Sequence, residues 1–229
     1  MISIAIDGPS GAGKSTISRK AAEIFGFIYV DTGAIYRTIG LASKIRGISL
    51  DDKAAVMEML TKLNIELKYN ESGEQHMYLD GKDVSRDIRL PEVSMLASKV
   101  SAIPEVRNFL VDMQRDMAKK YDVIMDGRDI GTVILPDADL KIFLTADVND
   151  RAQRRYEELR TKGMLKPFDE VLAEMKQRDD QDTLRAAAPL KAAEDAVMLD
   201  TSGNTLEQSI AEVCRLIADR TGRRFGGLA

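Results

Sequence analysis

Short apolar runs alternate with stretches of helical periodicity along most of this 229-residue chain. An apolar run bounded by turn residues is typical of a buried strand, whereas apolar residues three and four positions apart are typical of a helix. On this basis we expect strands at residues 2–6, 27–30, 123–125, 140–144 and 197–199. We expect helices at residues 14–25, 32–45, 51–63 and 206–219, and helical periodicity resumes near Pro91. This alternation predicts an α/β fold built on an open parallel sheet.

One region departs from the alternation. Apolar and polar residues alternate over residues 65–69 and again over 77–79, and a polar turn at 71–74 separates them. A period of two on both sides of a turn is typical of an antiparallel hairpin rather than of another strand–helix–strand unit. A third short strand is expected near residues 82–84. We therefore predict an insertion at about residues 63–99 that carries a small antiparallel sheet.

A glycine-rich loop joins the first expected strand to the first helix. Residues 8–15 fit the pattern G-x-x-x-x-G-K-[ST] of a phosphate-binding P-loop. Its glycines let backbone N–H groups approach a phosphate at the N-terminus of the helix. Lys14 is expected to reach the β- and γ-phosphates, and the Ser15 hydroxyl to bind Mg²⁺. The predicted nucleoside triphosphate site comprises Gly8, Pro9, Ser10, Gly11, Ala12, Gly13, Lys14, Ser15 and Thr16.

Charged residues follow two further strands, and the carboxyl ends of parallel strands gather around the ligand crevice of such folds. After the second strand, Thr32 is expected to cap the next helix and Arg37 to bind a phosphate. The alternative here is a capped helix with a solvated arginine. After the strand at 123–125, we expect Asp126 to help hold Mg²⁺ through water, Arg128 to bind phosphate and Asp129 to accept a hydrogen bond. The alternative is a turn of solvated charges.

Two later clusters have helical spacing. One predicts an arginine face of a lid over a polyanion, which would stabilise charge on a transferred phosphoryl group: Arg151, Arg154 and Arg155. Its alternative is an exposed face that pairs with Glu157 and Glu158. The other cluster is either part of the phosphate site or a ladder of salt bridges: Arg178, Asp182 and Arg185.

Composition narrows the class of protein. The formal net charge of −4 argues against a broad surface for nucleic acid or membrane. The single cysteine, Cys214, excludes an intramolecular disulfide and is expected to be a small buried hydrophobe. No apolar run approaches the roughly 20 residues of a membrane span. The chain also enters a strand without a signal-peptide pattern, so we expect a cytoplasmic protein.

Four segments together resemble the bacterial cytidylate kinase (CMP kinase) family of P-loop nucleoside monophosphate kinases. They are GPSGAGKS at residues 8–15, DTGAIYR at 31–37, DGRDIGT at 126–132 and RDDQDTLR at 178–185. The resemblance covers nearly the whole chain and implies one kinase domain, with a five-stranded parallel sheet flanked by helices. Its core would comprise residues 1–62, 100–146 and 168–229, with a monophosphate-binding insertion at 63–99 and a short lid at 147–167.

The resemblance also implies a reaction and its partners. ATP would phosphorylate CMP and dCMP with Mg²⁺ as cofactor, in pyrimidine nucleotide metabolism. We expect a monomer without nucleic-acid or membrane partners. The implied catalytic residues are Lys14, Arg128 and Arg178, and the implied lid residues that bind ATP are Arg154 and Arg155.

The family's CMP site falls on Thr32, Arg37, Ser98, Arg107, Arg128, Asp129, Arg178, Asp182 and Arg185. The resemblance implies that the base is read by Ser98, Arg107 and Asp129. It implies that Asp182 accepts a ribose hydroxyl and that four arginines bind phosphate: Arg37, Arg128, Arg178 and Arg185. Thr32 stands where the family often has serine, so the hydroxyl is retained.

The chemistry of the base supports the role of Asp129. Cytosine presents an exocyclic amino donor that suits a carboxylate, whereas uracil presents a carbonyl oxygen at the same place. A buried mismatch of this kind costs about 1–3 kcal/mol, so CMP should be preferred to UMP by roughly ten- to a hundredfold. Other readings of the P-loop are a UMP/CMP or adenylate kinase, a GTPase-like switch and a noncatalytic nucleotide-binding module. The switch is disfavoured because the chain has no Asn-Lys dipeptide.

Overall fold

The computed structural model describes residues 1–71, 74–161 and 163–224. Small parts of the expected insertion (72–73), lid (162) and core (225–229) therefore lie outside the described residues. The chain forms two compact units. The P-loop unit comprises Met1–Tyr29 and the chain from Tyr121 onward, and the helical unit comprises Val30–Lys120.

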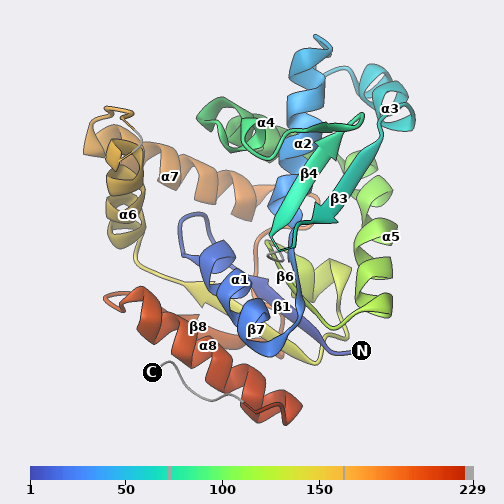
Figure 1. Cartoon of the computed structure of the whole chain (residues 1–229). Helices are drawn as coiled ribbons and strands as arrows, with labels where there is room; N and C mark the ends of the chain where they lie inside the picture. Colours follow the sequence, from blue (N-terminus) through green and yellow to red (C-terminus); the bar gives the residue numbers. More distant parts are fainter. Residues whose placement is uncertain (72–73, 162, 225–229) are drawn as a thin grey trace. The chain divides into compact units, whose positions relative to one another are not determined.

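The main sheet has five parallel strands in the order β2-β6-β1-β7-β8 (Figure 1). Its strands are β1 (Ser3–Asp7), β2 (Ile28–Asp31), β6 (Val123–Gly127), β7 (Leu140–Thr145) and β8 (Val197–Asp200). The central strands are apolar without alternation because both of their faces are covered, as is usual in parallel sheets. Ile4, Ile6 and Ile124, for example, are fully buried. The α/β fold predicted from the apolar runs is thus confirmed.

Two helices of the P-loop unit pack on this sheet, and two others pack on each other. They are α1 (Lys14–Phe25), α6 (Val148–Thr161), α7 (Phe168–Leu184) and α8 (Leu206–Thr221), with a π-helical turn η2 (Ile130–Ile134). Helices α1 and α8 share one hydrophobic core with the sheet. Cys214 lies in that core, where burial raises the pKa of its thiol to about 11. Helices α6 and α7 pack on each other through Ala152, Leu159, Val171 and Met175.

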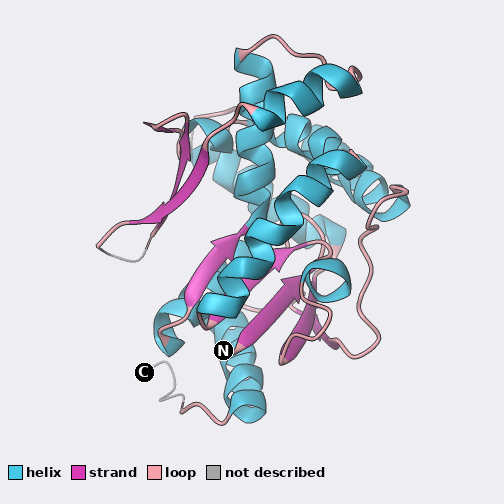
Figure 2. Ribbon diagram, turned by 90° about the vertical axis from the view of Figure 1, so that its right-hand side faces the viewer, coloured by secondary structure: helices cyan, strands magenta, loops and turns pink. Residues whose placement is uncertain are grey.

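The helical unit combines four helices with a small sheet. The helices are α2 (Thr32–Ile45), α3 (Lys53–Thr61), α4 (Pro91–Ser101) and α5 (Pro104–Lys120), and a 3-10 turn η1 spans Asp87–Arg89. The small sheet is antiparallel and consists of β3 (Ile65–Tyr69), β4 (Gln75–Leu79) and β5 (Lys82–Asp83). Strands are drawn in magenta in Figure 2, and Figure 1 labels β3 and β4. Met77 and Leu79 of β4 join the core that Ile35 and Ile39 of α2 form. The predicted hairpin and third strand are therefore confirmed.

Two local predictions are wrong. Thr32 is not the cap of α2, because Asp31 is the N-cap residue and its carboxylate accepts a hydrogen bond from Ala34 N. Arg185 does not continue the helical register of Arg178 and Asp182, because α7 ends at Leu184 and Arg185 has an extended backbone. Among the described residues, no helix is long and apolar enough to cross a membrane.

Candidate active site

The P-loop begins at Gly8, directly after β1, and leads into α1. Gly8 has a φ of +149°, and a Cβ atom there would lie 1.9 Å from the Leu144 carbonyl oxygen, so only glycine fits. Gly13 occupies the N-cap position of α1 in a left-handed conformation and provides no side-chain cap. The first N–H groups of α1 are therefore left for another acceptor, as anion binding at a helix N-terminus requires.

Lys14 is buried in the P-loop unit, and its Nζ donates a hydrogen bond to the Pro9 carbonyl at 2.6 Å. Burial and the neighbouring Arg128 hold the pKa of Lys14 well below its ordinary value, against the opposing effect of Asp126 and Asp182. The site therefore gathers charges of both signs around the P-loop lysine. A phosphate group entering there would meet a preformed electrostatic environment.

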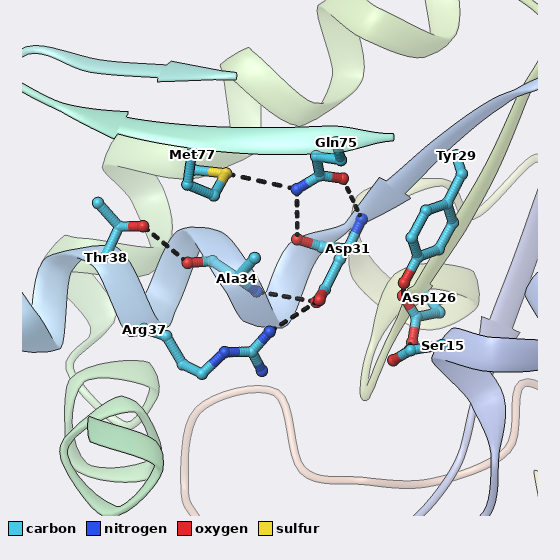
Figure 3. Close-up of polar contacts among 9 residues, drawn as sticks. All are labelled: Ser15, Tyr29, Asp31, Ala34, Arg37, Thr38, Gln75, Met77 and Asp126. Atoms are coloured by element: carbon cyan, nitrogen blue, oxygen red, sulfur yellow. Dashed lines mark hydrogen bonds and ion pairs between the residues drawn. The ribbon is translucent and has the colours of Figure 1, made fainter. Parts of the chain in front are cut away.

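Asp126 links the end of β6 to the P-loop (Figure 3). One oxygen of its buried carboxylate accepts a hydrogen bond from the Ser15 hydroxyl at 2.8 Å, and the other accepts one from the Tyr29 hydroxyl at 2.9 Å. Burial excludes the alternative of a solvated strand-end charge. Tyr29 was missed by sequence reasoning, because nothing local marks a tyrosine in a buried strand as a partner of a residue 97 positions away.

The pair of Ser15 and Asp126 fits a magnesium ion. Mg²⁺ prefers oxygen ligands and is usually held by one or two protein groups together with phosphates and water. A hydroxyl 2.8 Å from a carboxylate provides that chemistry. The residues that the structure describes contain no group of three or more His, Cys, Asp or Glu side chains able to hold a metal by themselves.

A buried ion pair joins the turn after β6 to α7. Arg128 Nε donates to Asp182 Oδ2 at 2.7 Å. Burial lowers the pKa of Arg128, but Asp182 and Asp126 outweigh it and hold the pKa above its ordinary value. Burial alone would raise the pKa of Asp182, but Arg128, Arg178 and Arg185 hold it below its usual range. The cluster predicted from spacing is thus brought together, with Asp182 among the arginines.

Asp129 lies next to this cluster and is also buried. Its Oδ1 is 3.7 Å from the nearest guanidinium nitrogen of Arg185, whose Nε donates to the Ala188 carbonyl at 2.7 Å. The alternative of a turn of solvated charges is therefore excluded for Asp129 as well as for Asp126.

Asp7, the last residue of β1, is a second functional candidate that sequence reasoning missed. Its buried carboxylate accepts hydrogen bonds from Ile130 N and Gly131 N, both at 2.8 Å. Burial raises the pKa of Asp7 to about 6, although these two bonds and Lys14 act in the opposite direction. The available signal was an acidic residue directly before the first glycine of the P-loop.

The three arginines of α6 have different surroundings, although they were predicted to share one face. Arg151 is buried, and its guanidinium contacts the carbonyls of Ser10 and Ala146 at 2.9 Å and Asp179 at 2.7 Å. Arg154 donates to the Thr201 carbonyl at 3.1 Å. Arg155 pairs with Glu158 at 2.7 Å, as in the alternative interpretation. Arg151 therefore supports the P-loop from α6.

The helical unit carries the rest of the predicted acceptor residues. Asp31 pairs with Arg37 at 2.7 Å while it caps α2, and its backbone N donates to Gln75 Oε1 at 2.8 Å (Figure 3). Arg37 is thus paired rather than solvated. Thr32 is buried at the start of the same helix.

Two further acceptor candidates of the helical unit lie near the junction of α4 and α5. Arg107 is buried, donates to the Ser101 carbonyl at 3.1 Å and lies with its guanidinium 5.6 Å from the centre of the Tyr36 ring. The carbonyl of Ser98 accepts a hydrogen bond from the Ser101 hydroxyl at 2.9 Å. Each unit thus holds its own subset of the predicted CMP residues.

The family model for cytidylate kinase matches residues 4–219. The chain belongs to the cytidylate kinase family. A cytidylate kinase of Caldicellulosiruptor bescii is 50% identical over 215 residues, covering 94% of this chain and 95% of that protein. One of Lactobacillus johnsonii is 43% identical, covering 95% of this chain and 94% of its own. The crystal structure of an uncharacterized protein from Eubacterium ventriosum shares the fold at a TM-score of 0.54 and 16% identity, covering 96% of this chain and 99% of that one.

Proposed function

We propose that this member of the cytidylate kinase family transfers the γ-phosphoryl group of ATP to CMP or dCMP, producing ADP and CDP or dCDP. The observation that carries the proposal is the convergence of Lys14, Arg128, Asp182 and Arg178 next to a P-loop. A noncatalytic nucleotide-binding module has no need of a second arginine cluster beside its P-loop. A transferase needs such a cluster, because its acceptor is itself a phosphate.

Positioning and charge neutralisation account for the reaction. A phosphate oxygen of CMP attacks the γ-phosphorus in line while the bond to the ADP oxygen breaks, so no covalent intermediate with the protein is needed. Lys14 holds the transferred phosphate from the P-loop side. Arg128 and Arg178 hold the acceptor phosphate and stabilise the charge that develops between donor and acceptor.

We assign the magnesium site to Ser15, as a direct ligand, and Asp126, through water. When bound, Mg²⁺ neutralises charge on the β- and γ-phosphates. The hydrogen bond between Ser15 and Asp126 supports the assignment because it already holds the two oxygen groups beside each other. In this arrangement Tyr29 orients the Asp126 carboxylate from its other oxygen.

The acceptor assignment follows the family resemblance. Asp129 accepts from the cytosine amino group, with Ser98 and Arg107 on the ring acceptors, and Asp182 accepts from a ribose hydroxyl. The CMP phosphate is assigned to Arg37, Arg128, Arg178 and Arg185, with Thr32 beside it. Burial of Asp129 supports its role, because a buried carboxylate distinguishes an amino group from a carbonyl more strongly than an exposed one does.

Several expectations stay proposals that rest on the family. The lid at residues 147–167, with Arg154 and Arg155 on ATP, and the insertion at 63–99 would exclude water that otherwise hydrolyses ATP. The monomeric state and the cytoplasmic location also stay predictions.

A coupled assay of ADP formation tests the proposed function. The purified chain is supplied with ATP, Mg²⁺ and one of CMP, dCMP, UMP or AMP. We expect turnover with CMP and dCMP, and a value of kcat/KM for UMP that is lower by roughly ten- to a hundredfold. Turnover with AMP alone would reject the proposal in favour of an adenylate kinase.

A further inference from the structure

Asp7 connects the start of the P-loop to the turn that carries Asp129. It is the last residue of β1, and Gly8 follows it directly. Its register partner in β6 is Gly127. Its carboxylate reaches past that partner, so that Oδ1 accepts from Ile130 N and Oδ2 from Gly131 N, both at 2.8 Å. Both carboxylate oxygens are thus used on two consecutive backbone amides.

These two amides belong to the first turn of η2, where N–H groups have no partner within the helix. An aspartate directly before a helix usually accepts from such groups itself. Asp129 occupies that position at η2 but makes no side-chain cap bond. The capping is done by Asp7, which lies 123 residues from Ile130 in the sequence. The Asp129 carboxylate lies 3.7 Å from a guanidinium nitrogen of Arg185.

Two sets of hydrogen bonds hold the backbone on the C-terminal side of Asp129. Its carbonyl accepts from Val133 N at 2.9 Å and from Ile134 N at 3.2 Å, and the two amides that follow it are held by Asp7. An aspartate side chain has few rotatable bonds, so a fixed backbone largely determines where its carboxylate lies. Loss of the Asp7 bonds would release one of these two supports.

We propose that Asp7 is a positioning residue for substrate recognition: it caps η2 in place of Asp129 and so holds the Asp129 carboxylate ready for the acceptor base. The inference rests on the proposed function, since the assignment of Asp129 to cytosine comes from it. Asp7 itself touches neither nucleotide in this scheme. Burial raises the pKa of Asp7 to about 6 while the two bonds lower it, so the bonds offset part of the cost of burying this carboxylate.

The test uses Asp7→Asn, which keeps the size of the side chain but replaces one acceptor oxygen with an NH₂ group that faces a backbone N–H. The KM for CMP should rise about tenfold, and the preference for CMP over UMP should fall by a similar factor. The KM for ATP should change less than about threefold. The matched control is Asp122→Asn, because Asp122 also accepts from a backbone amide, Ile2 N at 2.7 Å, at the opposite end of β1. It should leave the preference for CMP unchanged.

A double-mutant cycle separates positioning from mere support of the fold. If Asp7 acts through Asp129, then Asp7→Asn should change the CMP-over-UMP preference less than about twofold when Asp129→Asn is already present. Additive effects of the two substitutions on this preference would overturn the inference. So would equal rises of the KM values for CMP and ATP in Asp7→Asn, which would indicate general distortion.

Hydrogen exchange on the unmodified protein covers the case in which Asp7→Asn does not fold. The Ile130 and Gly131 amides should exchange slowly, and fast exchange at both would overturn the inference. If the unmodified protein does not phosphorylate CMP, the proposed function fails and the positioning role fails with it. If it does, an unchanged ratio of the two KM values in Asp7→Asn rejects the positioning role alone.

Discussion

Two strands of this chain, β2 and β6, carry acidic residues at their carboxyl ends, and the two groups of acidic residues are stabilised differently. At the end of β2, the Asp31 carboxylate binds Ala34 N and Arg37, three and six residues away. At the end of β6, the partners come from distant parts of the sequence. Asp126 binds Ser15, 111 residues away, and Arg128 binds Asp182, 54 residues away.

The two strands therefore illustrate two ways in which a protein can hold a buried charged group in place. A carboxylate that caps its own helix is held by local geometry, and its loss should be felt mainly in that helix. A carboxylate held by distant residues depends on the packing of the whole unit, and its loss should affect several elements together. Substitutions in the two segments should therefore differ in size and in kind.

The largest expected effect concerns Lys14, which belongs to the long-range network. Lys14→Ala should lower kcat by about 10³-fold or more, because it removes the cation that contacts the transferred phosphate. Burial already holds the pKa of this amine well below its ordinary value, so loss of the charge should cost little stability. The coupled assay and thermal unfolding of the same sample measure both effects. Near-normal turnover would contradict the role of the P-loop lysine.

Next in size is Asp182, the acidic partner of Arg128. Asp182→Ala leaves buried cations without their carboxylate and should lower the free energy of unfolding by about 3 kcal/mol at pH 7. The folded-state pKa of Asp182 lies below its ordinary 3.8, so its contribution is present above about pH 4 and is lost as the pH falls further. Urea unfolding of the original protein and of Asp182→Ala should show a large difference in the free energy of unfolding at pH 7 and a smaller one near pH 3. Asp180→Ala, on the exposed side of α7, is the control and should change stability by less than about 0.5 kcal/mol.

A substitution of Asp129 tests whether the segment held by distant residues serves to recognise the acceptor base. Asp129→Asn should reduce the preference for CMP over UMP by roughly ten- to a hundredfold, because an amide can donate to the uracil carbonyl as well as accept from the cytosine amino group. The KM for ATP should stay within about threefold of its original value. Competition assays with both monophosphates measure the ratio, and an unchanged ratio would remove Asp129 from the base site.

The smallest effect is expected in the local segment. Asp31→Ala removes the cap of α2 and the partner of Arg37, and it should lower the free energy of unfolding by about 1–2 kcal/mol. Asp52→Ala is the matched control, because Asp52 caps α3 through Ala55 N at 3.0 Å but lies exposed. It should cost about 1 kcal/mol or less. A loss for Asp31→Ala above that for Asp182→Ala would reverse the comparison of the two segments.

The same contrast explains how much the sequence could predict. The P-loop is contiguous in the sequence, so its residue types and spacing identified it. The central strands are buried on both faces, so they could be recognised as continuous apolar runs. The family motifs likewise identified the buried charges after β6. Tyr29 and Asp7 were missed because their hydrogen bonds span 97 and 123 residues, which no local pattern encodes.

The errors at helix ends have a related cause. Asp31 and Thr32 are adjacent and both suit an N-cap, so the choice between them depends on where β2 ends, which pairing in the sheet decides. Helical spacing placed Arg185 on the same face as Arg178, but α7 ends one residue before it. Spacing also grouped Arg151 with Arg155, although contacts with Ser10 and Asp179 from other segments give Arg151 a different role.

The buried thiol of Cys214 has a practical consequence for labelling chemistry. The cysteine thiolate is the nucleophile that attacks maleimides and other alkylating reagents, and burial both covers this sulfur and raises its pKa to about 11. Because the chain has a single cysteine, the native protein should stay unlabelled under conditions that modify an exposed thiol within minutes. A substitution such as Glu157→Cys on the exposed side of α6 would then carry a fluorophore at one defined place. The unmodified chain would serve as its own blank in such optical measurements.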